Sequence, residues 1–289
     1  MIKNKSLNWA NEPDRKEIKM ADGSVTIEFN GDTKNLDKDI NGISGKVQSG
    51  LGKLGSIAGT AMKGVTVAVG AASTALAGLG SASVSSYADL EQNVGGIETL
   101  FKGSADKVIK NAENAYKTAG MSANQYMETV TGFSASLLQS LGGDTDKAAD
   151  VADMALTDMA DNANKMGTSM ESIQYAYQGF AKQNYTMLDN LKLGYGGTTE
   201  EMERLLSDAQ KITGVKYDIS NLNDVYQAIH VIQGQLGITG TTAKEAASTI
   251  SGSVSSMKSA FDNFLNGSGT MDQLVNTGIT AIQNIINAV

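Results

Sequence analysis

The sequence predicts a mainly α-helical protein, in which a small β-hairpin precedes a long Gly/Ala-rich helix and a multi-helix region follows it. Three observations lead to this prediction. Apolar residues recur at helical spacing over an unusually long stretch, residues 46–101. Beyond it, hydroxyl residues that are followed three positions later by Glu or Gln mark a series of helix starts. The 289-residue chain contains a single proline, so long helices can run without interruption.

Composition and charge disfavour several classes of protein. The chain has 23 Lys and Arg residues against 31 Asp and Glu residues, a net charge of −8, and no basic block stands out. Nucleic-acid binding is therefore disfavoured, because it needs clustered cations. The absence of cysteine excludes disulfides, thiolate nucleophiles and Cys-based metal sites. The N-terminus lacks the apolar core of a signal peptide, so we expect synthesis in the cytoplasm.

Residues 1–45 predict a polar tail, a β-hairpin and a polar connector. The dipeptide Asp22-Gly23, which favours a two-residue hairpin turn, separates two candidate strands at 16–20 and 24–29. Every second residue from Val25 to Phe29 is apolar, so the second strand has one apolar face. Two strands alone are marginal in water, and we expect this hairpin to dock on another part of the chain.

Residues 46–101 predict one long helix with an apolar stripe. The stripe runs from Val47 to Phe101 in steps of three or four residues with a mean of 3.6, the period of a straight α-helix. Ten glycines inside the stretch oppose the helix, each by about 1 kcal/mol relative to alanine. We therefore expect this helix to need neighbouring surfaces.

The middle of this helix, residues 64–88, carries no charge. Small residues lie four positions apart, as Ala68 and Ala72 do, and such spacing allows helix backbones to pack closely in a bundle or in a membrane. We expect the full chain to self-associate through its stripe, and a fragment of residues 102–266 to be nearer to monomeric. Membrane insertion by residues 64–86 is the alternative.

Residues 102–266 predict a helical domain with thin apolar faces. Four sites have the spacing of a capping box: Ser122 with Gln125, Thr168 with Glu171, Thr198 with Glu201, and Thr242 with Glu245. Glycines supply stops between the helices. The predicted helices are 104–119, 122–141, 145–166, 169–182, 199–212, 221–236 and 242–265. One thin apolar face consists of Ala148, Ala152, Ala155, Met159, Ala163 and Met166.

Residues 267–289 predict a flexible break, Gly267–Thr270, and an apolar C-terminal helix over 274–289. The sequence ends partway through the apolar pattern of this helix. We therefore expect either a longer parent protein or an assembly partner that receives this end.

No catalytic constellation can be assembled from the sequence, and we predict no catalytic, cofactor-binding or metal-binding residues. His230 is the only histidine, and we place it on the flank of a buried stripe formed by Leu222, Val225, Ile229, Ile232 and Leu236, as a partly exposed and inert residue. One histidine supports neither a Ser-His-Asp triad nor an ordinary zinc site.

Three other groups of residues invite a chemical interpretation, and a structural one is preferred for each. Asp146, Asp150 and Asp153 share a helix face and could hold a cation, but they fit a solvated acidic face near a helix N-terminus. The loop Gly194–Thr199 lacks the Gly-Lys-Ser/Thr ending of a phosphate loop and fits a tight turn. The aromatic residues Tyr175, Tyr177, Phe180 and Tyr185 fit a helix-end core.

One stretch resembles a known family. The run from Met159 to Leu206, which begins MADNANKMGT and continues through SMESIQYAYQGFAKQNYTMLDNLKLGYGGTTEEMERLL, resembles the tail tape measure proteins of long-tailed phages and prophages. The segment Tyr87–Glu91, after a Gly/Ala/Ser-rich segment, is similar to the entry of the same helical region. The resemblance covers roughly residues 84–265, and the hairpin followed by a Gly-rich stripe is similar to the N-terminal part of such a protein.

The resemblance implies a non-enzymatic structural protein of the virion tail. Members of the family lie in the lumen of the tail tube, help to set tail length and assembly, and take part in DNA ejection at the host membrane. The implied partners are the tail tube protein, distal tail or baseplate hub proteins and tail assembly chaperones. The alternative from another class is an α-helical membrane-active or pore-forming protein that uses residues 64–86.

Overall fold

The computed structural model describes residues 79–288, and these residues form helices and connecting loops without a β-strand. The mainly α prediction is therefore confirmed for this part of the chain, whereas the hairpin predicted at 16–29 lies outside it. The α-helices are α3 (Leu79–Phe101), α4 (Ala105–Thr118), α5 (Ala123–Ser140), α6 (Thr145–Met166), α7 (Met170–Phe180), α8 (Thr199–Thr213), α9 (Leu222–Gln235), α10 (Thr241–Ser248), α11 (Ile250–Asn266) and α12 (Met271–Asn287), with 3-10 turns η2 (Lys102–Ser104) and η3 (Leu188–Leu191).

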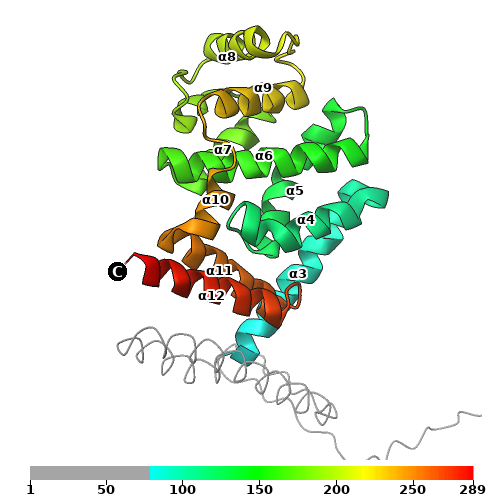
Figure 1. The fold of residues 1–289 in the computed structure, drawn as a ribbon. Coiled ribbons are helices and arrows are strands. Elements are labelled where there is room, and N and C mark those ends of the chain that lie inside the picture. The colour runs from blue at the N-terminus through cyan, green and yellow to red at the C-terminus, as the bar shows by residue number, and fades with distance from the viewer. Residues whose placement is uncertain (1–78, 289) are drawn as a thin grey trace, which may run out of the picture. The chain divides into compact units, whose positions relative to one another are not determined.

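Figure 1 shows the helices as a stack, with α8 and α9 at one end and α11 and α12 near the other. Helix α6 runs across the middle of the stack and packs against α5, α7 and α9. One apolar core extends from α3 to α9 and includes large side chains that are completely buried. Examples are Phe101, Met127, Leu156, Ile173 and Ile229. Each such side chain contributes about 1.5–3 kcal/mol by leaving water.

Aromatic side chains fill the core where α5, α7 and α9 meet. Tyr226 packs edge-on against Phe133, with ring centroids 5.6 Å apart, and its ring lies 5.0 Å from that of Tyr177. The Tyr226 hydroxyl donates to the Tyr177 carbonyl oxygen over 3.0 Å, so the polar end of a buried ring is satisfied.

Most predicted helix boundaries agree with the structure to within two residues. Helix α6 has the predicted bounds, and α5 begins with the predicted capping box, in which the Ser122 hydroxyl and the Gln125 side chain each accept from the other's backbone amide. The apolar face of α6 is also confirmed, since its members from Ala148 to Met159 are buried and Ala163 and Met166 pack against the core.

Two of the four predicted capping boxes are wrong, and the box of Thr198 with Glu201 is half formed, because Thr198 caps α8 while the Glu201 carboxylate accepts from the Gly196 amide. Helix α7 is capped by Ser169 and not by Thr168, whose hydroxyl donates to the Asn190 carbonyl oxygen instead. Helix α10 has Gly240 at its N-cap position, without a side-chain cap of its own. The Asp161 carboxylate of α6 accepts instead from the Gly240 and Thr242 amides at the start of α10.

The single helix predicted over 242–265 is divided at Thr249 into α10 and α11. Thr249 has an extended backbone, and its hydroxyl accepts from the Gly252 amide over 3.0 Å and so caps α11. A Cβ atom at Gly252 would lie 2.4 Å from the Glu245 carbonyl oxygen, so only glycine permits this close approach. Helix α12 begins at Met271, three residues before the predicted start, because Thr270 and Gln273 form an unforeseen capping box.

Helix α3 is the part of the helix predicted over 46–101 that the structure describes, and it ends at Phe101 as predicted. Ile97 and Phe101 are fully buried, while Tyr87 is 52% exposed. Helices α4, α5 and α11 pack against α3, so the stripe from Leu90 to Phe101 is covered by the same chain. Stripe residues before Leu79 lie outside the described part. Among residues 79–288, no helix has both the length and the apolar composition needed to cross a membrane.

Candidate functional site

Helix α6 carries a row of buried polar side chains at the middle of the fold. Asp158, Asp161 and Asn162 are each at most 1% exposed. Their spacing of three and four residues places them on one side of the helix. We call them the α6 polar row. Buried polar groups in proteins are almost always hydrogen-bonded, so the partners of this row show what it holds in place.

The first member, Asp158, pairs with the only histidine of the chain. The Nδ1 atom of His230, on α9, lies 2.9 Å from both carboxylate oxygens of Asp158. A carboxylate accepts only, so Nδ1 carries a proton. This hydrogen bond raises the pKa of His230, and burial raises the pKa of Asp158. The His230 side chain is 37% exposed, so the pair has a buried acid and a solvent-accessible base.

The other members hold two loops against α6. The Asp161 carboxylate accepts from the Gly240 amide over 2.5 Å and from the Thr242 amide over 2.8 Å, and so serves as the N-terminal cap of α10. The Asn162 amide donates to the Leu191 carbonyl oxygen, at the end of η3, over 2.9 Å. The row therefore ties α6 to α9, to α10 and to η3.

The chemistry open to this row is proton exchange at His230. An oriented imidazole beside a carboxylate can act as a general base, but it needs a reacting group within reach. Within residues 79–288, no set of three or more His, Asp or Glu side chains is arranged to hold a metal ion. The prediction that His230 lies partly exposed on the flank of a buried stripe is confirmed. Its buried acid partner was missed, and Leu236, which was expected in that stripe, is 52% exposed.

Asp146 and Asp150 at the start of α6 lie on a solvated face, as predicted, and both also pair with a lysine. Lys107 on α4 reaches Asp146 over 2.9 Å and Asp150 over 2.8 Å. These hydrogen bonds raise the pKa of Lys107. The third acid, Asp153, accepts from the buried Tyr126 hydroxyl over 2.7 Å, and its own pKa is raised by burial. The acids thus join α6 to α4 and α5.

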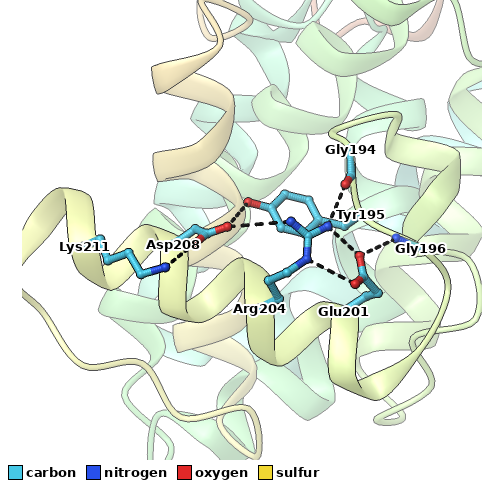
Figure 2. A network of polar contacts seen from close by, with 7 residues as sticks. All are labelled: Gly194, Tyr195, Gly196, Glu201, Arg204, Asp208 and Lys211. Atoms are coloured by element: carbon cyan, nitrogen blue, oxygen red, sulfur yellow. Dashed lines mark hydrogen bonds and ion pairs between the residues drawn. The ribbon is translucent and has the colours of Figure 1, made fainter.

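The glycine-rich loop before α8 forms a tight turn, as predicted, and Figure 2 shows the polar network around it. Arg204 donates to the Gly194 carbonyl oxygen and to both Glu201 oxygens, and its guanidinium lies 4.2 Å from the centre of the Tyr195 ring. Burial and the hydrogen bond to Asp208 raise the pKa of Tyr195 to about 12. Hydrogen bonds of this network join the loop to α8, so the arrangement rigidifies the turn.

The predicted aromatic core at the end of α7 is confirmed for three of its four members. Tyr177, Phe180 and Tyr185 are at most 5% exposed, and the last two rings are stacked with centroids 6.0 Å apart. Tyr175 lies on the other side of α7 and is 51% exposed.

A groove of about 670 Å³ lies between α5, α6, α7, α10 and α11. Its lining is about half polar and includes three glutamates, Glu128, Glu171 and Glu245. The Gln174 side chain, which also lines it, donates to the Thr129 hydroxyl over 2.9 Å. The groove could receive a small polar molecule or a side chain of a partner.

The sequence contained one signal for the α6 polar row that our reading did not use. Asp158 and Asn162 continue the helical phase of Ala155, so polar residues replace alanine on a face that is buried along its length. Such a replacement indicates that a partner for a buried polar group lies elsewhere in the chain. Comparisons with protein families, curated proteins and solved structures gave no match to this chain.

Proposed function

We propose that this chain is a structural tape measure protein of a long-tailed phage or prophage. In this proposal it lies in the lumen of the tail tube, helps to set tail length and assembly, and takes part in DNA ejection at the host membrane. Its partners are the tail tube protein, the distal tail or baseplate hub proteins and the tail assembly chaperones. Its place is the virion tail.

The observation that supports the proposal most is the position of the stretch that carries the resemblance. Residues 159–206 begin in the middle of α6 and include η3 and the polar turn before α8. Two of their polar residues, Asp161 and Asn162, are completely buried and hold α10 and η3 in place. Part of the stretch that carries the resemblance therefore specifies the fold. Because a fold can serve several functions, the functional step remains a proposal.

The fold also suggests a different role for each part of the chain. A ruler must be extended, and a helix advances 1.5 Å per residue, so α3 with its 23 residues spans about 35 Å. The helices after α3 fold back on one another around one core and add little to that length. We therefore assign a ruler role to the sequence before residue 79, and an anchoring role within the tail to residues 79–288.

Purified tails provide the test of this function. In a phage or prophage that carries this protein, we expect mass spectrometry of purified tails to find the chain, and a stop codon early in its gene to abolish tails of defined length. Absence of the chain from tails of normal length would contradict the proposal. Binding of the full chain to liposomes without any tail component, together with normal tails in its absence, would favour the membrane-active alternative.

A further inference from the structure

Helix α10 separates two grooves. It bridges α6 and α11 (Figure 1). Thr242 and Glu245, one helical turn apart, line the groove of about 670 Å³ described above. Ala243 and Ala247, also one turn apart, line a second groove of about 430 Å³ between α4, α11 and α12. Ala246 lines both, so α10 is a wall that the two grooves share.

Helix α10 has little hold on the apolar core. None of its eight residues is buried, whereas every other α-helix within residues 79–288 buries at least two. Burial of apolar surface is the main stabilising term in folding. An element with few buried apolar contacts opens locally, at a free energy well below that of global unfolding. Helix α10 is therefore the α-helix of the described fold that should open most readily.

Polar contacts at both ends hold α10 in place. At its N-terminal end, the Asp161 carboxylate accepts from two backbone amides, over 2.5 and 2.8 Å. At its C-terminal end, the Asn284 amide of α12 donates to the Ala247 and Thr249 carbonyl oxygens, over 3.3 and 3.1 Å. Both contacts come from side chains of other helices, so they break when α10 moves away.

The segments on either side of α10 are suited to act as hinges. Gly240, just before the helix, has a φ angle of +82°, in the region that favours glycine. Thr249, just after it, has an extended backbone that interrupts the helical path between α10 and α11. Outside these two positions, Ile238 and Ser253 are each 1% exposed and are held by the fold. Movement is therefore confined to residues 239–249, which we call the α10 flap.

Detachment of α10 leads to its unfolding. Isolated helices shorter than about 12–15 residues are marginal in water, and α10 has eight residues. Once its two end contacts are lost, the flap therefore unfolds as one unit. The space that α10 occupied then connects the two grooves that it had separated.

We propose that the α10 flap opens by local unfolding and joins the two grooves into one trough along α11. The Asp161 carboxylate is the latch of this flap, and the α11 backbone at Gly252 is its seat. A Cβ atom at Gly252 would lie 2.4 Å from the Glu245 carbonyl oxygen, so α10 rests directly on this glycine. The proposal does not depend on the tape measure function.

Hydrogen exchange of the full chain, followed by mass spectrometry, tests this proposal. In the wild type, we expect the amides of residues 244–249 to exchange at least about tenfold faster than those in the middle of α9, after correction for their intrinsic rates. Low concentrations of urea should accelerate exchange in α9 and leave that of the flap unchanged, because a local opening exposes little new surface.

Two variants with matched controls identify the latch and the seat. D161A removes the acceptor, and G252A places a methyl group against the Glu245 carbonyl oxygen, so each should accelerate flap exchange about tenfold or more. D146A removes an exposed acid from the same helix as Asp161, and G95A adds a methyl group that meets no neighbour within 4 Å. Both controls should leave flap exchange within about twofold.

The comparison within the wild type needs no variant, so it stands even where a substitution lowers overall stability. Flap amides that exchange as slowly as those of α9, or a flap exchange that rises with urea in step with α9, would overturn the proposal. Equal flap exchange in each variant and its control would overturn the assignment of the latch and the seat.

Discussion

His230 and Asp158 form a pair between α9 and α6 in which the acid is 1% exposed and the imidazole 37% exposed. Loss of one partner from a buried ion pair leaves the charge of the other uncompensated, and this destabilises the folded state. The pair is therefore a point at which a single substitution, or a change of pH, alters the contact between two central helices.

The stability of the protein should fall as pH rises through the titration of His230. The pKa of His230 is raised in the folded state by its hydrogen bond to Asp158, so its contribution is fully present below the unfolded value of about 6.5 and is lost above the folded pKa. The raised pKa of Asp158 acts in the same direction at lower pH. We expect the wild type to exceed H230Q in free energy of unfolding by more at pH 5.5 than at pH 8.5.

Urea denaturation at the two pH values measures this difference. H230Q removes the sole imidazole of the chain and preserves a hydrogen-bond donor, so the titrations of groups outside the pair cancel between the two proteins. A difference that does not change between pH 5.5 and pH 8.5 would show that the pair has no electrostatic role.

Asp161 should be more important for stability than the acids at the start of the same helix. D161A leaves the Gly240 and Thr242 amides without their acceptor and should cost about 1–3 kcal/mol. D146A is the matched control, because Asp146 is 72% exposed and its ion pair with Lys107 is worth less than about 1 kcal/mol. Equal thermal stability of the two variants would refute the capping role of Asp161.

Gly197 should tolerate no side chain, whereas its neighbour Gly196 should accept alanine. A Cβ atom at Gly197 would lie 2.2 Å from the Thr186 carbonyl oxygen, so G197A must displace the backbone and should cost about 1–3 kcal/mol. At Gly196 the nearest atom, on Glu201, would be at an ordinary 3.5 Å. Thermal melting of both variants makes the comparison, and a G197A protein as stable as G196A would contradict this packing.

The best folded fragment should include α3 and α12. Removal of α3 takes Ile97 and Phe101 out of the core, and removal of α12 uncovers α11. We therefore expect residues 79–288 to unfold cooperatively and at a higher temperature than residues 102–266, the fragment that sequence reasoning favours. Calorimetry of both fragments decides this, and a higher melting temperature for the shorter one would be the contrary result.

The sequence predicted the helices well because local signals mark their ends. The hydroxyl of Ser122 and the acceptor of Gln125 lie three residues apart, so the capping box is visible in a short window. The cap of α10 could not be predicted in this way, because Asp161 lies 79 residues before Gly240. The pairing of His230 with Asp158 and that of Lys107 with Asp146 likewise depend on tertiary packing, which periodicity alone does not reveal.

The break at Thr249 was missed for a related reason. The sequence around it reads as one helix, and the chain leaves that helix because Gly252 lets α11 approach the Glu245 carbonyl oxygen closely. The apolar residues of α12 were visible in the sequence, but only the structure shows that α12 packs on α11 and buries Gly278 and Ala281.

Tail length is the measurement that tests the proposed function most directly. The described residues begin at Leu79, so a deletion of residues 57–78 removes sequence-predicted stripe helix without reaching the described fold. The 22 lost residues correspond to roughly 33 Å and close to six helical turns, which preserves the phase of the stripe. In a phage or prophage that carries this protein, electron microscopy should show tails shorter by up to that length, with tube diameter unchanged.

A second deletion, of residues 59–78, serves as the control. It removes 20 residues and turns the stripe by roughly 160°, and it should reduce the yield of tails more than their length. The central claim is that the sequence before residue 79 acts as a ruler and that residues 79–288 act as its anchor. Shortened tails from the 22-residue deletion are the result it predicts, and tails of normal length at normal yield would contradict it.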